Sequence, residues 1–497
     1  MKKYLTIGII SAIIFASFFI FSSRFYPILN SDDAVTILMT RWFHLPEDLY
    51  FWGQDRYGSI IPMIGQFFNK VLSLSPVVSE SLSHYLILVL GFLAFSTLLK
   101  SNKGKIFLAV LWFFPPFHFI DLVRNVAGVQ YSLVGILIFL VNFYHRPDLQ
   151  KTPWQQWVVL VGITVSVVML LWISDIAAAS VFIIILVLIW FHRNERSNIS
   201  SDFRRKEIYF LLSGVLLAGL FIWYARYHAV RIEDYHANPF NNFGGSLEAC
   251  LQLKKSAIAI LTFRSDNPFT GIYMYLVILL CLIIIRSYHK DFLPRNNRQW
   301  FLFFIAEGIL IFLIILWSRW ALLNGIPRRY FTGIYIVGWL AFLMILENYP
   351  VSIHKKILQI FTVITLMVGV FSSFYYFGFQ RPKSLKPMVT VVGEFRSLGS
   401  IGLIAEYWNS YITAVPDPDR IKATPHDKDY VRNWKMVDSV FAQPHIYVIK
   451  DMWLDEFPDT LIQFDRILVS KGEAFFIGNC WVKEYMPCQN HHSFGAP

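Results

Sequence analysis

Two acidic residues, Asp32 and Asp33, follow the first long apolar run of this 497-residue chain. A carboxylate within hydrogen-bond distance of a hydroxyl can remove its proton as the oxygen attacks, so either residue is a candidate general base. Both also stand where a helix is expected to begin. Acidic side chains are favoured there because they cap the helix and interact with its dipole. Capping and catalysis are compatible, and both interpretations stay open.

Two arginines late in the apolar part, Arg328 and Arg329, are candidates for binding a phosphate. A planar guanidinium group donates two parallel hydrogen bonds to phosphate oxygens, so arginine suits a phosphate that must be held and neutralised. Arginines next to an apolar run can equally contact lipid headgroups. The sequence alone does not separate these two roles.

Further polar residues lie in short segments between apolar runs. The candidates for substrate contact are Gln54, Asp55, Tyr57, Asp121 and Tyr330. Tyr57 and the glycines beside it can instead form a turn and an interfacial anchor. Asp121 lies in a short turn, where a solvated residue is the simpler explanation, and the same holds for Asp175. Glu307 falls inside an apolar run, where an ionisable residue is costly and either functional or hydrogen-bonded to a neighbouring helix.

The elements that position these residues are membrane helices. The chain is 56% hydrophobic and only 15% charged, whereas soluble proteins have about 25% charged residues. Its apolar residues gather into runs of the length that crosses a bilayer, about 20 residues as helix. About eleven spans are predicted, at residues 4–23, 82–99, 106–123, 126–143, 157–175, 176–191, 208–228, 270–286, 300–318, 331–347 and 357–377. The expected fold is a mostly α polytopic membrane domain over residues 1–379.

The net charge of +11 is spread over short loops, without the basic groove or motif of a nucleic-acid binder. No nucleic-acid partner is expected. The loops predicted to lie on the side of Lys2 and Lys3 are basic, so the N-terminus is placed in the cytoplasm. An odd number of spans then places residues 380–497 outside. The chain is expected to be a multi-pass protein of a bacterial inner (plasma) membrane.

The C-terminal segment, residues 380–497, is predicted to be a small extracytoplasmic α/β domain. Prolines, acidic residues and short alternating runs such as His445–Ile449 and Ala474–Ile477 replace the long apolar runs there. Cys480 and Cys488 are close in sequence, and a disulfide between them suits an oxidising compartment. The first outer loop, 24–81, is predicted to hold a helix over 34–45 in the headgroup region, because its apolar and aromatic residues share one face.

Three short elements resemble the polytopic GT-C glycosyltransferases of the dolichyl-phosphate-mannose mannosyltransferase and RgtA-like type. In that group the first outer loop begins with an acidic pair, and an amphipathic segment and a Gly-Gln-x-x-Tyr-Gly-Ser element follow. This chain has Asp32-Asp33 and then Gly53-Gln54-Asp55-Arg56-Tyr57-Gly58-Ser59. Ile326–Phe331 resembles the Arg-Tyr element of a late helix, and Ala405–Tyr411 resembles a Tyr-Trp-x-x-Tyr element of the outer domain.

The resemblance implies a sugar donor joined to a polyprenyl phosphate and an acceptor hydroxyl on a lipid or glycan of the envelope. Transfer would pass through an oxocarbenium-like state with inversion and one carboxylate as base. By analogy Asp32 is favoured over Asp33 as the base. Arg328 or Arg329 would bind the donor phosphate. Many members of that group have a second acidic residue in a later outer loop, sometimes as a metal ligand, so the resemblance makes Asp121 a candidate metal ligand. The cofactor is unknown, and a divalent metal (Mg or Mn) is an open option. No His/Cys/Asp cluster with zinc spacing and no phosphate-binding glycine loop appears in the sequence.

Two other functions compete with this interpretation. An O-antigen ligase or polymerase would rely on arginine and histidine in a long mid-chain loop, where residues 229–268 offer Arg231 and His236. A lipid or solute transporter would show repeated halves and polar groups at mid-membrane. The chain has no internal repeat, and its polar groups gather at the predicted outer surface.

Overall fold

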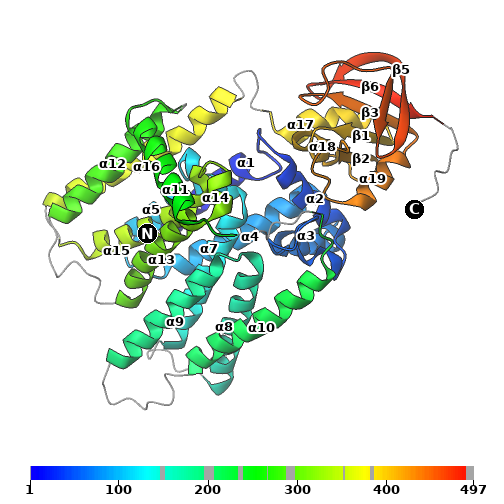
Figure 1. The fold of residues 1–497 in the computed structure, drawn as a ribbon. Helices are drawn as coiled ribbons and strands as arrows, with labels where there is room; N and C mark the ends of the chain where they lie inside the picture. Colours follow the sequence, from blue (N-terminus) through cyan, green and yellow to red (C-terminus); the bar gives the residue numbers. More distant parts are fainter. Residues whose placement is uncertain are drawn as a thin grey trace.

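A computed structural model describes residues 2–145, 152–194, 206–232, 239–265, 267–286, 297–350, 353–380 and 386–488. A large helical part is followed by a small mixed α/β unit at the C-terminal end (Figure 1). The mostly α fold class with a C-terminal α/β unit is therefore confirmed.

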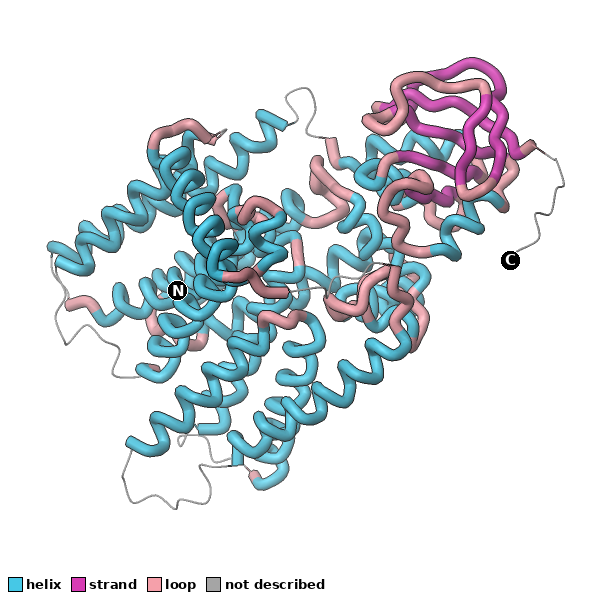
Figure 2. The backbone as a smooth tube through the Cα atoms, in the orientation of Figure 1, coloured by secondary structure: helices cyan, strands magenta, loops and turns pink. Residues whose placement is uncertain are grey.

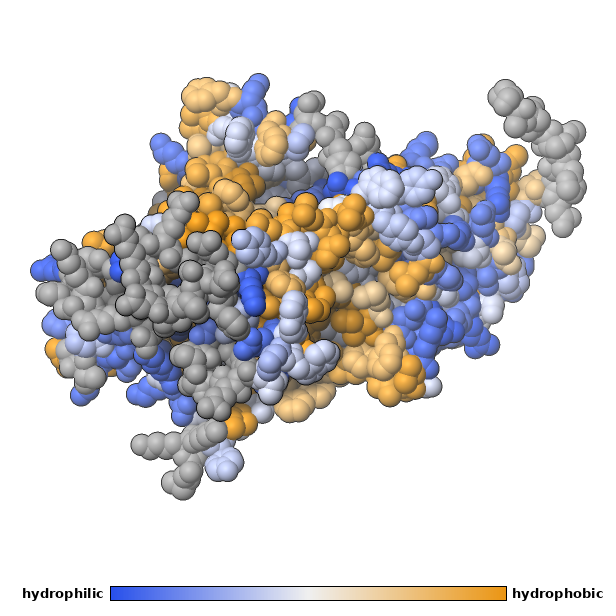
Figure 3. Space-filling model, turned by 90° about the horizontal axis from the view of Figure 1, so that it is seen from below, coloured by the Kyte–Doolittle hydropathy of each residue, from blue (hydrophilic) through white to orange (hydrophobic). Residues whose placement is uncertain are grey.

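Nine described helices are long and apolar enough to cross a membrane. They are α1 (Lys2–Phe21), α4 (Pro76–Ser96), α7 (Val126–His145), α8 (Pro153–Ile173), α10 (Lys206–His228), α12 (Pro268–Arg286), α13 (Arg298–Trp317), α15 (Thr332–Asn348, extended by η4, Arg328–Phe331) and α16 (Ile353–Gln380). The shorter helix α9 (Ala177–Asn194) is also apolar. Seen from below, a band of apolar surface covers the middle of the molecule and hydrophilic surface covers the C-terminal unit (Figure 3).

The predicted span 106–123 is wrong as a single straight helix. Helix α5 (Asn102–Phe113) ends early, and the chain continues through η2 (Phe117–Phe119) and α6 (Asp121–Arg124) with a bend of 76°. Pro115 and Pro116 lie at the break. Proline lacks a backbone N–H and clashes with the preceding turn, so a helix cannot continue through this pair. Because of the bend, Asp121 and Arg124 belong to the short separate helix α6 and do not continue the axis of α5.

The first loop contains α2 (Ser31–Trp42), η1 (Glu47–Leu49) and α3 (Ile60–Val71). Asn30 begins α2 with a capping box, in which its side chain and that of Asp33 each accept a backbone N–H of the other residue. A helix is therefore present near the predicted range 34–45, and its position in the headgroup region stays a prediction. It packs against α3, α4 and α18 (Tyr407–Ala414) and is buried on most sides.

The C-terminal unit is built on one six-stranded sheet of order β2-β1-β3-β6-β5-β4. Strands β1, β2 and β3 are parallel, and β3, β6, β5 and β4 pair antiparallel. Its elements are α17 (Met388–Val391), η5 (Val392–Leu398), β1 (Ile401–Ala405), α18, β2 (Ile421–Pro425), α19 (Trp434–Phe441), β3 (His445–Lys450), β4 (Thr460–Gln463), β5 (Arg466–Ile477) and β6 (Cys480–Pro487). The two predicted strands correspond to β3 and the end of β5.

The expected disulfide between Cys480 and Cys488 is wrong, since neither cysteine forms a disulfide in the structure. Cys480 begins β6 and Cys488 follows its last residue. A strand rises by about 3.4 Å per residue, so the two residues are about 27 Å apart. A disulfide requires Cα atoms within about 7 Å of each other.

Helix α2 joins the helical part to the C-terminal unit. The unit lies beside α2 and α3 in the ribbon and in the tube view (Figures 1 and 2). Ala34, Val35 and Leu38 share one apolar core with Phe395 and Tyr411 of the C-terminal unit. The N-terminal end of α2, which carries the acidic pair, is thereby fixed between the two parts.

Candidate active site

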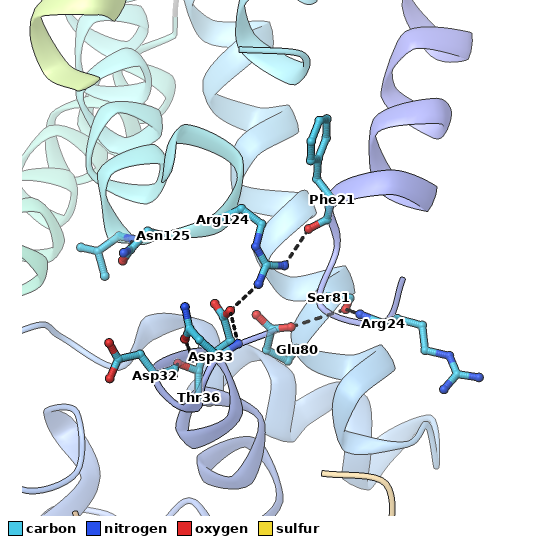
Figure 4. A network of polar contacts seen from close by, with 11 residues as sticks. Phe21, Arg24, Asp32, Asp33, Thr36, Glu80, Ser81, Arg124 and Asn125 are labelled. Atoms are coloured by element: carbon cyan, nitrogen blue, oxygen red, sulfur yellow. Dashed lines mark hydrogen bonds and ion pairs between the residues drawn. The ribbon is translucent and has the colours of Figure 1, made fainter. Parts of the chain in front are cut away.

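Asp33 is held in a buried ion pair with Arg124, the last residue of α6 (Figure 4). Arg124 donates a hydrogen bond to Asp33 Oδ2 and another, of 2.7 Å, to the carbonyl of Phe21. Asp33 also completes the cap of α2 through the backbone N–H of Asn30, at 3.3 Å. Burial raises the pKa of Asp33, and the charge of Arg124 opposes that rise. These contacts give Asp33 a role in fixing the end of α2.

Arg124 is surrounded by further acidic and aromatic groups. Its side chain is 6% exposed, and its guanidinium carbon lies 3.9 Å from the centre of the Tyr26 ring. Glu80, buried near the start of α4, lies on the same side and within range of its charge (Figure 4). The charge of Arg124 thus interacts with two buried acids, Asp33 of α2 and Glu80 of α4.

Asp32 is arranged differently. It is exposed and points away from the pair formed by Asp33 and Arg124 (Figure 4). Its Oδ1 accepts a hydrogen bond from the hydroxyl of Tyr407 at the start of α18. Within the part of the chain that the structure describes, its other carboxylate oxygen has no hydrogen-bond partner. Of the two aspartates, Asp32 has the free oxygen that a base needs.

The late arginines and Asp121 lie at the same end of the helical part. The 3-10 segment η4 packs against η2, where Arg328 donates to the ring of His118. Asp121 lies within range of the charge of Arg329, and of the charges of Asp33 and Arg124. The guanidinium carbon of Arg329 is 5.7 Å from the centre of the Tyr330 ring. The structure thus links Arg329 to Asp33 through Asp121 and directs Arg328 toward His118.

The Gly53–Ser59 element forms a tight loop whose polar side chains are mostly used within it. Asp55 is buried and pairs with Arg231 at 3.1 Å. Arg56 donates to Gln54 at 3.3 Å. Tyr57 has a positive φ of 62° and remains partly exposed, within range of the charge of Arg329. Gln54 and Asp55 are therefore placed to hold the loop, and Tyr57 is the member of the three that lies within range of the charge of Arg329.

The other residues singled out from the sequence have plain structural partners. Asp175 pairs with Arg226 at 3.3 Å in an exposed position. Glu307 is buried in α13 and accepts a hydrogen bond from Ser180 of α9, which is the helix-to-helix contact considered for it. His236 lies outside the described residues.

The residues that the structure describes include no group of three His, Cys, Asp or Glu side chains able to hold a metal ion. The charges that act on Asp121 are those of two arginines, Arg329 and Arg124, and of one acid, Asp33. Asp121 as a metal ligand therefore stays a prediction, without a set of three ligating side chains among the described residues.

Glu80 and Arg432 were not among the residues predicted from the sequence. Glu80 stands in the run Ser79-Glu80-Ser81 at the start of an apolar helix, and an ionisable residue at that place is itself a signal. Arg432 donates through Nε to the Tyr407 hydroxyl at 3.2 Å. It lies in a polar loop between β2 and α19, where nothing in the local sequence distinguishes it from other surface arginines.

No protein-family model matches the chain. No curated protein matches it in sequence. Among solved structures it is similar to ArnT from Cupriavidus metallidurans bound to undecaprenyl phosphate, with a TM-score of 0.56 and 9% identity over 100% of this chain and 99% of that chain. The Archaeoglobus fulgidus oligosaccharyltransferase in the apo form has a TM-score of 0.47 and 10% identity over 90% of this chain and 70% of that chain. The similarity to ArnT confirms the expected GT-C fold.

Proposed function

We propose that this chain is a membrane glycosyltransferase that moves a sugar from a polyprenyl-phosphate donor to a hydroxyl group of an envelope lipid or glycan. The observation that carries the proposal is the position of Asp32. It is an exposed carboxylate with one free oxygen, at the end of the molecule where Arg329, Tyr330 and Tyr57 also gather. The similar ArnT structure contains undecaprenyl phosphate, which is a polyprenyl phosphate and supports this donor class.

The proposed reaction is one inverting displacement. The acceptor oxygen forms a bond to the anomeric carbon as the bond from that carbon to the phosphate oxygen breaks. Asp32 takes the hydroxyl proton, and the polyprenyl phosphate leaves with the electron pair of the broken bond. Arginine charge stabilises the phosphate as negative charge develops on it.

Arg329 and Arg328 are the proposed phosphate ligands. Arg329 is close enough to Asp121 for the two charges to interact, and Tyr57 also lies within range of its charge. Arg328 donates to an imidazole, which accepts without an opposite charge when neutral, so this contact does not cancel the charge of the guanidinium. Tyr57 and Tyr330 are proposed to contact the donor, and Asp121 to orient Arg329.

We further propose that the reaction takes place on the outer face of a bacterial inner membrane. The basic loops argue for a cytoplasmic N-terminus. With that orientation, the acidic pair, η4 and the C-terminal unit all lie on the outer side. Cysteine-scanning accessibility at Asn433 and Lys103 tests this topology, with labelling from outside expected only at the former.

Transfer from a panel of labelled polyprenyl-phosphate sugars to envelope lipids in reconstituted vesicles tests the function. We expect Asp32→Asn to lower the rate by about 100-fold to 10,000-fold, the range typical of a lost general base. Asp33→Asn should cost less, because Asp33 is already paired with Arg124. Full transfer by Asp32→Asn would refute the proposed base.

The same assay separates the competing functions. A ligase-type mechanism predicts loss only with changes at Arg231 or His236. Arg231 already pairs with buried Asp55, which accounts for it structurally. A transporter predicts movement of solute across the vesicle membrane without formation of a glycosidic bond.

A further inference from the structure

The hydroxyl of Tyr407 connects the two parts of the molecule at the acidic pair. It donates a hydrogen bond to Asp32 Oδ1 across a separation of 375 positions in the sequence. The backbone carbonyl of the same tyrosine accepts a hydrogen bond from Ser31 Oγ. Tyr407 is therefore hydrogen-bonded to both residues that begin α2, to Asp32 through its side chain and to Ser31 through its backbone.

Arg432 contacts both the hydroxyl and the ring of Tyr407. Its Nε donates to the Tyr407 hydroxyl at 3.2 Å, and its guanidinium carbon lies 5.1 Å from the centre of the Tyr407 ring. The backbone N–H of Arg432 donates to the hydroxyl of Tyr411 at 2.8 Å. Tyr407 is 2% exposed and Arg432 is 8% exposed, so these two side chains have little freedom to adopt other positions.

The direction of these hydrogen bonds has a chemical consequence. The phenol accepts from the guanidinium and donates to the carboxylate, so the positive charge makes it a stronger donor to Asp32. One oxygen of Asp32 is fixed by this bond. The other oxygen is then held in one direction, toward the solvent-exposed side on which an acceptor hydroxyl would approach.

We propose that Tyr407 and Arg432 are positioning residues for the base, so that the C-terminal unit completes the active site. This inference rests on the proposed function, because it assumes that Asp32 takes the proton. It adds that the helical part holds the carboxylate and the C-terminal unit sets its direction. A buried partner that fixes a reacting group contributes to the rate without touching the substrate.

Tyr407→Phe removes the hydroxyl and keeps the ring in its place. We expect kcat to fall about tenfold or more, in line with the loss of a hydrogen bond to a charged group. The KM for the lipid donor should stay within about twofold, because Tyr407 contacts no proposed phosphate ligand. Arg432→Gln should lower kcat in the same way, and Arg432→Lys should recover part of the loss.

Tyr411→Phe is the matched control. Tyr411 lies on the same helix, is equally buried and also has its hydroxyl hydrogen-bonded to Arg432, yet it does not contact Asp32. This change should lower the thermal unfolding midpoint and leave kcat of the folded protein near that of the wild type. Equal losses of kcat in Tyr407→Phe and Tyr411→Phe would show a structural role only and overturn the inference.

The outcome for Asp32→Asn distinguishes the two levels of the proposal. If Asp32→Asn abolishes transfer and Tyr407→Phe retains the wild-type kcat, the positioning role is refuted and the base is kept. If Asp32→Asn retains transfer, the proposed function itself fails, whatever Tyr407→Phe does.

Discussion

At the scale of single residues, Arg124 forms an ion pair with only one member of the acidic pair, Asp33. Its charge is used by Asp33 and Glu80, and all three side chains are largely buried. A buried charge is tolerated when it is paired and becomes costly once its partner is removed. The ion pair therefore fixes Asp33 and leaves Asp32, one position earlier, free to face the solvent.

Arg124→Gln should destabilise the protein by about 3–5 kcal/mol, because it leaves two buried acids without their cation. The double variant Arg124→Gln/Asp33→Asn should be more stable than Arg124→Gln alone, since the orphaned charge at position 33 is gone. Thermal unfolding in detergent measures both effects. Strictly additive losses in the double variant would show that the two residues do not act as a pair.

The types of residue at this site could be predicted from the sequence, but the directions in which their side chains point could not. Asp32 and Asp33 are adjacent and chemically identical, and only their three-dimensional partners distinguish them. Those partners, Arg124 and Tyr407, lie 91 and 375 positions away. The Ala405–Tyr411 element can be found from its resemblance to a family motif, whereas Arg432 lies in a loop without any periodic pattern to mark it.

At the scale of elements, the start of α7 holds α6 in place by close approach. A Cβ at Gly128 would lie 1.8 Å from the carbonyl oxygen of Leu122, which belongs to α6. Only glycine allows these backbones to approach so closely. Since α6 ends at Arg124, this contact fixes the position of the cation that Asp33 needs.

Gly128→Ala should therefore destabilise the protein by about 3 kcal/mol through overpacking and lower sugar transfer as α6 shifts. Gly219→Ala on the exposed side of α10 is the control, because a Cβ there would have no atom within 4 Å. Its unfolding midpoint should equal or exceed that of the wild type, since alanine favours a helix over glycine. The unfolding midpoints and sugar-transfer rates of the two variants test this prediction. Equal midpoints and equal rates in Gly128→Ala and Gly219→Ala would contradict the packing argument.

Apolar run length predicted the membrane helices well and their interruptions less well. Spans such as α7 and α13 follow from about 20 consecutive apolar residues. The break at Pro115 and Pro116 has a clear signal in the sequence. The burial of α2 has none, because an amphipathic pattern shows that one face is covered but not whether lipid or protein covers it.

At the scale of the whole molecule, the C-terminal unit and the first loop form one folded body. Leu38 of α2 is fully buried in the same apolar core as Phe395 and Tyr411. Two ion pairs reinforce the contact, from Arg41 to Asp419 at 3.0 Å and from Lys435 to Glu47 at 2.7 Å. Exposed pairs of this kind contribute less than about 1 kcal/mol each, so the apolar core provides most of the stability of the contact.

Leu38→Ala should then cost about 2–5 kcal/mol, the range for removing a large side chain from a closed core. Leu72→Ala, at an exposed site just after α3, should change stability by less than about 0.5 kcal/mol. Limited proteolysis should release the C-terminal unit faster from Leu38→Ala than from either the wild type or the control. Transfer should fall with that release, because the unit that carries Tyr407 no longer stays against Asp32. If Leu38→Ala released the unit while transfer continued at the wild-type rate, the helical part would suffice for catalysis and the two-part active site would be wrong.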